Sequence, residues 1–261
     1  EKKRKDSNAF ESSAEVLSIS FDGYDGELTV KEGEIVGLAG LAGSGRSSVL
    51  RTIWGTKPRS DIHLRYLGEE YKPKNPMHAL KKKIAYISED RSESGLFFGQ
   101  PIKETVLMAH RNLQRKLLVK NKSEDKLLGQ IIGEVQIKVP THECMPEALS
   151  GGNQQKLLFG RWITDEAKLL LLDEPTRGDD IKTKHEIYQR VRKMVEANNA
   201  GALVVSSELE ELVLMCDKVL IIRDGHVEDV LTGDRITENN MMAEITASGK
   251  TKQQTEDNKS V

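Results

Sequence analysis

Cysteine is scarce in this sequence, with only Cys144 and Cys216 among 261 residues. Two thiols are too few for a disulfide framework, which excludes the small secreted scaffolds that depend on one. Neither cysteine has a second metal-ligating residue at a zinc-site spacing, so we expect no cysteine-based metal site. A reducing compartment is the environment that this composition favours.

An excess of either charge is also lacking, because 39 Lys and Arg residues nearly balance 41 Asp and Glu residues. Without a basic field we expect no nucleic-acid partner. No apolar run approaches the roughly 20 residues of a membrane span, and no segment has the pattern of a secretory signal peptide. The chain opens on Glu-Lys-Lys-Arg-Lys rather than Met, from which we expect a domain cut from a longer protein.

A glycine-rich stretch at residues 40–48 is the most informative local feature. It follows an apolar run at residues 35–39, typical of a buried strand, and precedes a helical pattern at residues 49–54. Residues 40–47 fit the phosphate-loop pattern G-x-x-x-x-G-K-[ST], except that Arg46 replaces the lysine. The glycines allow successive N–H groups to face phosphate oxygens, and Ser47 is placed to offer its hydroxyl to Mg²⁺. The alternative is a glycine-rich strand–helix turn with no ligand.

A second specific stretch runs from Lys168 to Thr176. Its four leucines predict a fully buried strand that ends in Asp173 and Glu174. Ligands of open α/β sheets lie beyond the carboxyl ends of strands. Asp173 is therefore suited to hold Mg²⁺, and Glu174 to orient or deprotonate a water. The alternative is a strand followed by a solvated acidic turn.

The remaining pattern predicts an α/β chain. Alternation at residues 14–21 and 27–30, around a turn cluster at 22–26, predicts a small antiparallel sheet before the phosphate loop. We expect Phe21 or Tyr24 either to stack on an adenine ring or to pack in the core or turn. Further expected elements are strands at 84–87, 202–206, 219–222 and 226–231, and helices near 77–82, 181–196 and 238–245. A helical periodicity from residue 102 predicts an inserted helical subdomain at about 100–165.

Residues 149–156 read Leu-Ser-Gly-Gly-Asn-Gln-Gln-Lys. Ser150 is a suitable helix N-cap, and Gly151 and Gly152 permit close approach of another backbone. This segment predicts a helix N-terminus that could face an anion. An ordinary helix start is the alternative on these residues alone.

Four motifs follow one another along the chain. They are the phosphate loop, the Leu-Ser-Gly-Gly element, the Leu-Leu-Leu-Leu-Asp-Glu stretch and the Gly-Asp-Asp at 178–180. Together they resemble the nucleotide-binding domain of ABC transporters, over nearly all of residues 14–246. Other phosphate-loop kinases and GTPases lack the Leu-Ser-Gly-Gly element. Residues 88–91, 149–156, 174–178 and 206–209 further resemble the second ATPase half of double-domain importers for ribose, galactose, xylose and related sugars or nucleosides.

This resemblance implies a P-loop NTPase (RecA-like) core with an N-terminal antiparallel β subdomain and an inserted α-helical signature subdomain. The implied domain spans residues 14–247, between a flexible segment at 1–13 and a flexible tail at 248–261. ATP and Mg²⁺ are the implied cofactors, with Glu174 as the catalytic carboxylate and Ser47, Glu89 and Asp173 near the metal. The implied nucleotide-binding residues are Gly40, Leu41, Ala42, Gly43, Ser44, Gly45, Arg46, Ser47, Ser48, Ser150, Gly151, Gly152, Asp180 and Ser207.

Three residues depart from the family pattern. Arg46 stands for the phosphate-loop lysine, and its guanidinium is broader and planar where lysine is a compact charge. Glu89 stands where most members have a glutamine, and Ser207 where most have the switch histidine. Positioning and charge stabilisation carry most of phosphoryl-transfer catalysis. We therefore expect weak ATP binding or slow turnover at this domain's own site.

The signature element is complete, and ABC domains dimerise head-to-tail, each site combining one partner's phosphate loop with the other's signature. The resemblance thus implies that Ser150, Gly151 and Gly152 complete a competent site on a second ATPase domain, in the same or a fused chain. Transmembrane permease subunits are further implied partners, with a substrate-binding protein acting through them, and the implied location is peripheral, on the cytoplasmic face of the cell membrane. Phe97, Phe98 and Ile102 would line the permease groove or lie in the core.

Two rival functions remain at this stage. One is a purely structural, non-hydrolysing nucleotide-binding module that docks on a membrane protein. The other is a DNA-repair or chromosome-structure ATPase with the same head. Such proteins insert long heptad coiled coils between their phosphate motifs, and this sequence contains none.

Overall fold

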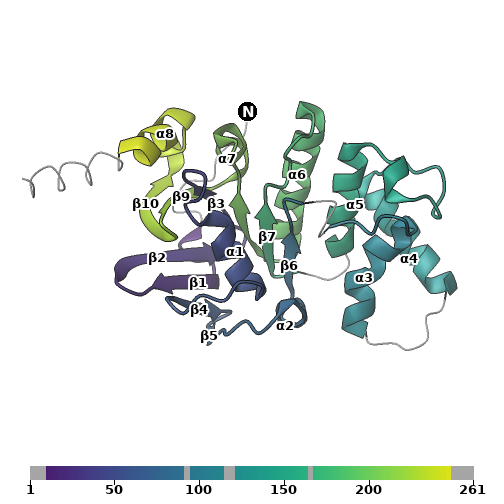
Figure 1. The fold of residues 1–261 in the computed structure, drawn as a ribbon, viewed down its shortest axis with the longest axis horizontal. Helices are drawn as coiled ribbons and strands as arrows, with labels where there is room; N and C mark the ends of the chain where they lie inside the picture. The colour runs from purple at the N-terminus through teal and green to yellow at the C-terminus, as the bar shows by residue number, and fades with distance from the viewer. Residues whose placement is uncertain (1–9, 91–94, 115–120, 164–166, 248–261) are drawn as a thin grey trace, which may run out of the picture.

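The structure, a computed structural model, describes residues 10–90, 95–114, 121–163 and 167–247. In this range the chain forms two β-sheets and a separate group of helices at one side (Figure 1). The segments 1–9 and 248–261, which were expected to be flexible, lie outside the described residues. Phe10, at the start of the described chain, is buried beside Gly33.

The larger sheet has six strands in the order β10-β9-β3-β8-β7-β6. Strands β3, β6, β7, β8 and β9 are parallel to one another, and β10 is antiparallel at the edge. All residues of β3, β7 and β8 are buried, as their continuous apolar runs require in a sheet covered on both faces. The strands are β3 (Ile35–Ala39), β6 (Ile84–Ile87), β7 (Leu169–Asp173), β8 (Gly201–Val205), β9 (Lys218–Arg223) and β10 (His226–Thr232).

The smaller sheet is antiparallel, with the order β2-β1-β4-β5. Its β1–β2 pair confirms the antiparallel strands predicted before the phosphate loop, whereas β4 and β5 follow α1 in the chain and were not predicted. Its strands are β1 (Glu15–Phe21), β2 (Tyr24–Lys31), β4 (Ile62–Tyr66) and β5 (Glu69–Glu70). The second strand begins at Tyr24 rather than at residue 27, because Gly23, with φ 76°, lets the chain turn within two residues. Phe21 is buried and meets His226 edge-on, so core packing is the correct alternative for this ring.

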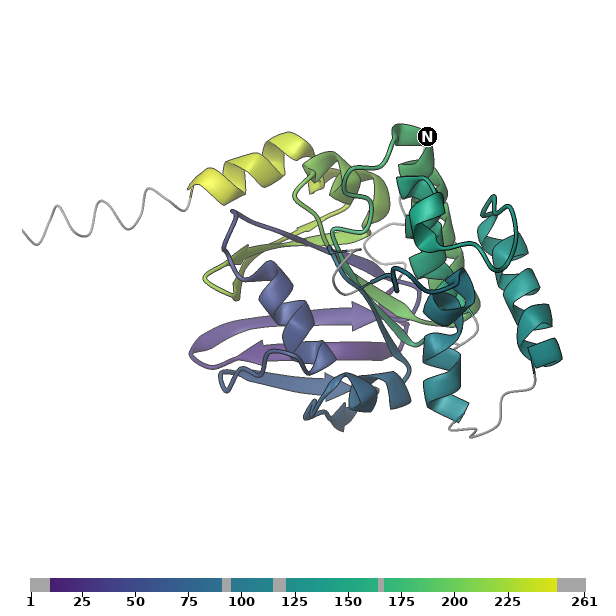
Figure 2. The same cartoon turned by 45° about the vertical axis from the view of Figure 1, so that its right-hand side comes forward.

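Helix α1 (Arg46–Trp54) lies between the two sheets (Figure 2). Its buried residues Val49, Leu50 and Ile53 share one apolar core with β1, β2, β3 and β4. The opposite face of the larger sheet carries a second core, to which α6 contributes Ile187 and Val191. Helices on or beside the sheets are α2 (Pro76–Lys81), α6 (Ile181–Ala197), α7 (Leu209–Met215) and α8 (Glu238–Ala247).

The helical group consists of α3 (Ile102–Gln114), α4 (Asn121–Val135) and α5 (Gly151–Ile163), and it lies beyond the β6 edge in both ribbon views (Figures 1 and 2). It has a core of its own, which includes Leu107, Leu128 and Leu157. Ile102 is fully buried in this core, whereas Phe97 and Phe98 are 40% and 41% exposed. No helix in the described residues is long and apolar enough to span a membrane.

Candidate nucleotide-binding site

The phosphate loop joins β3 to α1 through glycines whose backbone conformations disfavour other residues. Gly43 and Gly45 have φ values of 81° and 95°, in the left-handed region. A Cβ on Gly45 would lie 2.8 Å from the Cα of Gly225, whereas a Cβ on Gly43 would meet nothing within 4 Å. Helix α1 has no side-chain cap and no acidic residue in its first turn. Its first N–H groups are therefore available to an anion, and the loop fits a phosphate chain.

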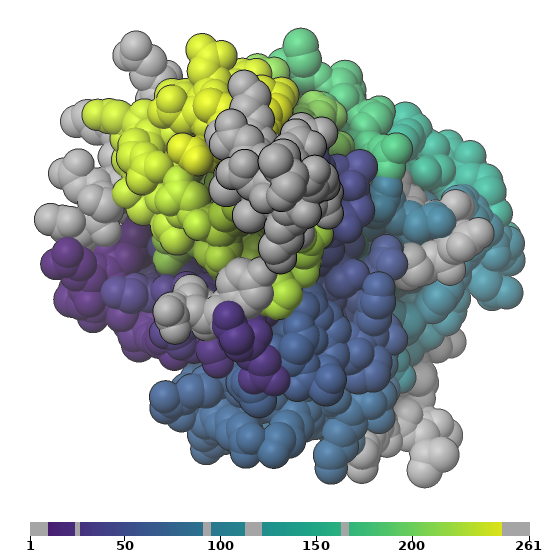
Figure 3. Space-filling view, turned by 60° about the vertical axis from the view of Figure 1, so that its left-hand side comes forward, coloured from purple at the N-terminus to yellow at the C-terminus, as the bar shows by residue number. Residues whose placement is uncertain are grey.

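The hairpin between β9 and β10 supports the loop from one side. The Gly225 N–H donates to the Ser44 carbonyl at 2.7 Å, and Ser44 is buried. Its Oγ has no hydrogen-bond partner among the described residues. Leu41 is 61% exposed and Ala42 is exposed, so the tip of the loop faces outward. In the space-filling view of Figure 3, the yellow-green C-terminal elements lie above the blue surface of the residues that follow α1.

Arg46 points across the strand ends. Its Nη1 donates to the carbonyl of Ser206, directly after β8, at 2.7 Å. Burial lowers the pKa of Arg46, while the carboxylates of Glu174, Asp173 and Glu89 act in the opposite direction. The guanidinium thus lies near three carboxylates and already has one of its donors engaged by the protein.

Asp173 is fully buried at the end of β7. Ser47 Oγ donates to its Oδ1 at 2.7 Å, and the Tyr86 hydroxyl donates to its Oδ2 at 3.0 Å. Burial, and secondarily the Asp173 charge, raises the pKa of Tyr86, so this phenol remains a donor. Arg51 Nη2 lies 3.9 Å from the same Oδ2. Ser47 and Asp173 were predicted from the sequence, whereas Tyr86 and Arg51 were not.

The neighbouring Ser47 hydroxyl and Asp173 carboxylate are hard oxygen ligands of the kind that Mg²⁺ prefers. Among the residues that the structure describes, no group of three or more His, Cys, Asp or Glu side chains converges on one point. A Mg²⁺ ion at Ser47 and Asp173 would therefore take its other ligands from phosphate and water, as this ion commonly does.

Glu174 follows in a backbone conformation with φ 51°, unusual for a residue with a side chain. Its N–H donates to the Val205 carbonyl at 2.9 Å, which fixes the residue against the end of β8. Ser207 Oγ donates to Glu174 Oε2 at 3.0 Å. The predicted catalytic carboxylate and the predicted switch position are therefore in direct contact.

Glu89 forms an ion pair with Arg177, a residue in the turn after β7. Both side chains are partly exposed. The anion that replaces the usual glutamine thus has a cationic partner, Arg177, which was not predicted from the sequence. This pairing reduces the charge that Glu89 adds beside the phosphate loop.

The signature element lies at the start of α5, on the far side of β6 and β7 from α1 (Figure 1). Ser150 and Gly151 are exposed. A Cβ on Gly152 would lie 2.9 Å from Thr183 Oγ1 in α6. Asp180 caps α6 by accepting from the Thr183 N–H at 2.9 Å, and this bond is the main cause of its lowered pKa. Thr183 therefore brings the signature and Asp180 together.

Gln155 connects the signature helix to the strand that carries the carboxylates. It is buried in α5, and its Nε2 donates to the Pro175 carbonyl. No separate role for Gln155 was predicted from the sequence. This hydrogen bond connects α5 directly to the turn after Glu174.

Comparison with known proteins agrees with this geometry. The family model described as ABC transporter matches residues 25–177. The chain is 36% identical over 215 residues to a ribose import ATP-binding protein of Bacillus cereus, covering 82% of this chain and 43% of that protein. It is 33% identical over 220 residues to a galactose/methyl galactoside import ATP-binding protein of Vibrio vulnificus, covering 84% and 44%. The chain thus spans less than half the length of these relatives.

A solved dimeric ATP-binding cassette, in a post-hydrolysis state with ADP and Pi bound, matches with a TM-score of 0.69 at 19% identity. The match covers 83% of this chain and 98% of the cassette. The fold class predicted from sequence, a P-loop core with an antiparallel β subdomain and an inserted helical signature region, is confirmed. On the family model and these relatives, the chain belongs to the ABC transporter family.

Proposed function

We propose that this chain is the ATP-binding domain of an ABC importer for sugars such as ribose or galactose, or for related nucleosides. The relatives from Bacillus cereus and Vibrio vulnificus are named as importers of ribose and of galactose, which supports the sugar class. Those relatives are more than twice as long as the matched segment, which supports a second ATPase domain as the partner. A related cassette is dimeric, which supports direct pairing of two such domains.

In this proposal residues 40–48 hold the phosphates of ATP through backbone N–H groups and the N-terminus of α1. Ser47 and Asp173 hold Mg²⁺, which when bound would neutralise charge on the phosphate oxygens. Glu174, buried and fixed by its backbone bond to Val205, is the group that would orient a water. Glu89, paired with Arg177, lies at the edge of this site.

We propose that this site hydrolyses ATP slowly, and two contacts support this proposal. Arg46 donates to the Ser206 carbonyl, so one of its donors is held away from a phosphate. Ser207 donates to Glu174, where the family's histidine would face the phosphate. A serine hydroxyl neither carries a positive charge nor titrates near neutral pH. Loss of a single electrostatic donor typically costs about 10²–10³ in turnover.

The signature has none of these departures. Ser150 and Gly151 are exposed at the start of α5, where their helix N-terminus is accessible to another molecule. Thr183 of α6 lies directly against Gly152, and Gln155 binds this helix to the Pro175 carbonyl in the turn after β7. We propose that this surface, with Asp180, binds the γ-phosphate side of ATP held by the partner domain in a head-to-tail pair.

A groove of about 790 Å³ separates the α1–α2 region from the helical group. Aromatic and methionine side chains line it, among them Trp54, Met77, Tyr86, Met108 and Trp162. We propose that a cytoplasmic segment of a transmembrane permease binds in this groove, which would place the domain on the cytoplasmic face of the membrane. Phe97 and Phe98 are exposed and could extend that contact. A substrate-binding protein would act only through the permease.

ATP turnover by this chain, alone and mixed with its partner domain, tests the proposal. We expect the chain alone to hydrolyse ATP at least about 100-fold more slowly than the pair, because its own site lacks two electrostatic groups. Fast turnover by the chain alone, abolished by E174Q, would contradict a degenerate site. A pair no faster than the partner alone would instead favour the rival function, a purely structural module.

A further inference from the structure

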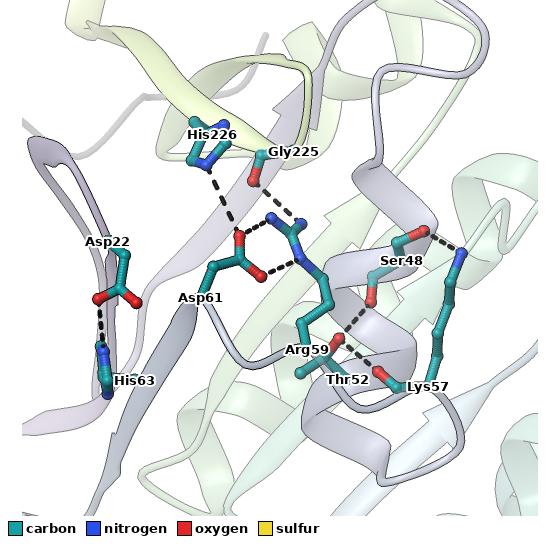
Figure 4. Close-up of polar contacts among 9 residues, drawn as sticks. All are labelled: Asp22, Ser48, Thr52, Lys57, Arg59, Asp61, His63, Gly225 and His226. Carbon is teal, nitrogen blue, oxygen red and sulfur yellow. Dashed lines mark hydrogen bonds and ion pairs between the residues drawn. The ribbon is translucent and has the colours of Figure 1, made fainter.

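Lys57 lies beside the phosphate loop without belonging to it. It follows the C-terminal end of α1, and its Nζ donates to Ser48 Oγ at 3.1 Å. Ser48 is the last residue of the loop motif and lies in the first turn of α1. Figure 4 shows the lysine side chain running back along the helix to this hydroxyl. A flexible four-carbon side chain thus delivers an ammonium group to the N-terminal turn.

The turn that carries Lys57 is firmly held. The single proton of the Thr52 hydroxyl is shared between the carbonyls of Ser48 and Lys57, which lie 2.9 and 2.7 Å from Oγ1 (Figure 4). The N–H groups of Thr56 and Lys57 donate to the Arg51 carbonyl at 3.0 and 3.2 Å. These bonds fix the Lys57 backbone relative to α1, so its side chain starts from a defined point.

The charge of Lys57 is not neutralised by the nearby protein. No carboxylate in the described part of the chain forms an ion pair with it, and the residue is exposed. Arg59, two residues on, is instead bound by Asp61 through Nε and Nη2 (Figure 4). Arg46 in the loop lies near three carboxylates. Lys57 therefore has a charge available for an anion at the N-terminus of α1.

We propose that the Lys57 ammonium group binds the phosphate chain of a nucleoside di- or triphosphate held by residues 40–48. This inference rests on the proposed function and adds a residue to its binding site. The ammonium supplies a compact charge from outside the loop, while Arg46 is engaged with Ser206. Ser48 shares its hydroxyl between Lys57 and the ligand, because a hydroxyl oxygen has two lone pairs and one proton.

The position of Lys57 also indicates which phosphate groups it can contact. Ser47 and Ser48 are adjacent in a helix, so their side chains leave it about 100° apart. Ser47 faces Asp173, whereas Ser48 faces Lys57. The ammonium is thus on a different side of the helix from the carboxylates that would surround the terminal phosphate of ATP. We expect Lys57 to contact a phosphate that ADP and ATP share.

Binding of fluorescent ADP and ATP analogues to the 261-residue chain tests this inference. We expect K57M to raise both dissociation constants about five- to tenfold at low salt, because a charge-assisted hydrogen bond is lost, and by less at high salt. K57R, which keeps the charge, should recover most of the affinity. K72M removes an 80%-exposed lysine that pairs with Glu70 instead, and is the matched control.

Equal affinities for K57M, K72M and the unsubstituted chain would overturn the role of Lys57 while leaving ATP binding intact. A loss confined to ATP would overturn the assignment to a shared phosphate. If the unsubstituted chain bound neither nucleotide, the proposed function itself would fail, and this inference with it. Lys57 is exposed, so we expect K57M to unfold at the same temperature as the unsubstituted chain.

Discussion

S150R should lower ATP turnover of the assembled transporter about 100-fold, because it blocks the proposed contact between this domain's signature and ATP on the partner. Ser150 is exposed at the start of α5, so the longer side chain has room in the free domain. In the head-to-tail pair it would enter the partner's site and displace the phosphate or hold the two domains apart. The measurement is steady-state phosphate release by the reconstituted pair with its permease.

The same substitution at Ser12 is the matched control, since Ser12 is an exposed serine outside the site. S12R should leave turnover within about twofold of the unsubstituted protein, as surface changes away from such features usually do. Thermal unfolding of each variant separates a local effect from misfolding. Undiminished turnover in S150R would remove the basis for signature donation.

The second large effect that we expect concerns E211Q. Its free energy of unfolding, relative to that of the unsubstituted chain, should change by about 3 kcal/mol between low and high pH. Glu211 lies in the first turn of α7 and is 2% exposed. Burial raises its pKa from 4.5 to about 7, although Ser206 and Thr176 hydrogen-bond to it. Thr176 Oγ1 donates to its Oε1 at 2.7 Å. Between about pH 4.5 and 7 this carboxyl therefore keeps, in the folded chain, a proton that it would release in the unfolded chain.

A raised carboxyl pKa stabilises the fold at low pH, because the folded state binds the proton more tightly than the unfolded state. That contribution is complete below pH about 4.5 and is lost as the pH rises to about 7. Glutamine imitates the protonated group and retains an oxygen that can accept from Thr176. The free energy of unfolding of E211Q, relative to the unsubstituted chain, should therefore rise across this window and then level off.

Denaturant unfolding at pH 4.5, 6 and 8 measures this difference. Glu210, exposed and adjacent in the same helix, supplies the matched control E210Q, which should show no such trend. Comparison with the unsubstituted chain cancels the contribution of other titrating groups. Parallel stability curves for E211Q and the unsubstituted chain would contradict the assignment of a raised pKa to Glu211.

The parts of the fold with local signals could be predicted from sequence. Four consecutive leucines required burial on both faces and so predicted β7, and Asp224-Gly225 predicted the turn between β9 and β10. The three- and four-residue spacing of apolar side chains predicted the helices after residue 102. The phosphate loop and its carboxylates met because parallel strands bring their carboxyl ends to one edge.

The contacts that shape the site chemistry had no such signal. Arg177 and Glu89 are 88 residues apart, and neither position shows which partner it will find. The same holds for Tyr86 with Asp173, and for Gln155 with Pro175. Composition also could not separate Ile102, which is core, from Phe97 and Phe98, which are partly exposed. Burial of single apolar residues depends on tertiary packing rather than on periodicity alone.

The proposed function requires an asymmetric pair, in which this domain would complete its partner's site while its own site hydrolysed little ATP. The direct measurement is turnover of the assembled transporter with E174Q in this domain, compared with glutamine at the catalytic carboxylate of the partner. We predict that E174Q leaves turnover within about twofold, since the competent site is untouched, and that the partner's substitution abolishes it. Loss of turnover with E174Q, equal to the loss in the partner, would contradict the account.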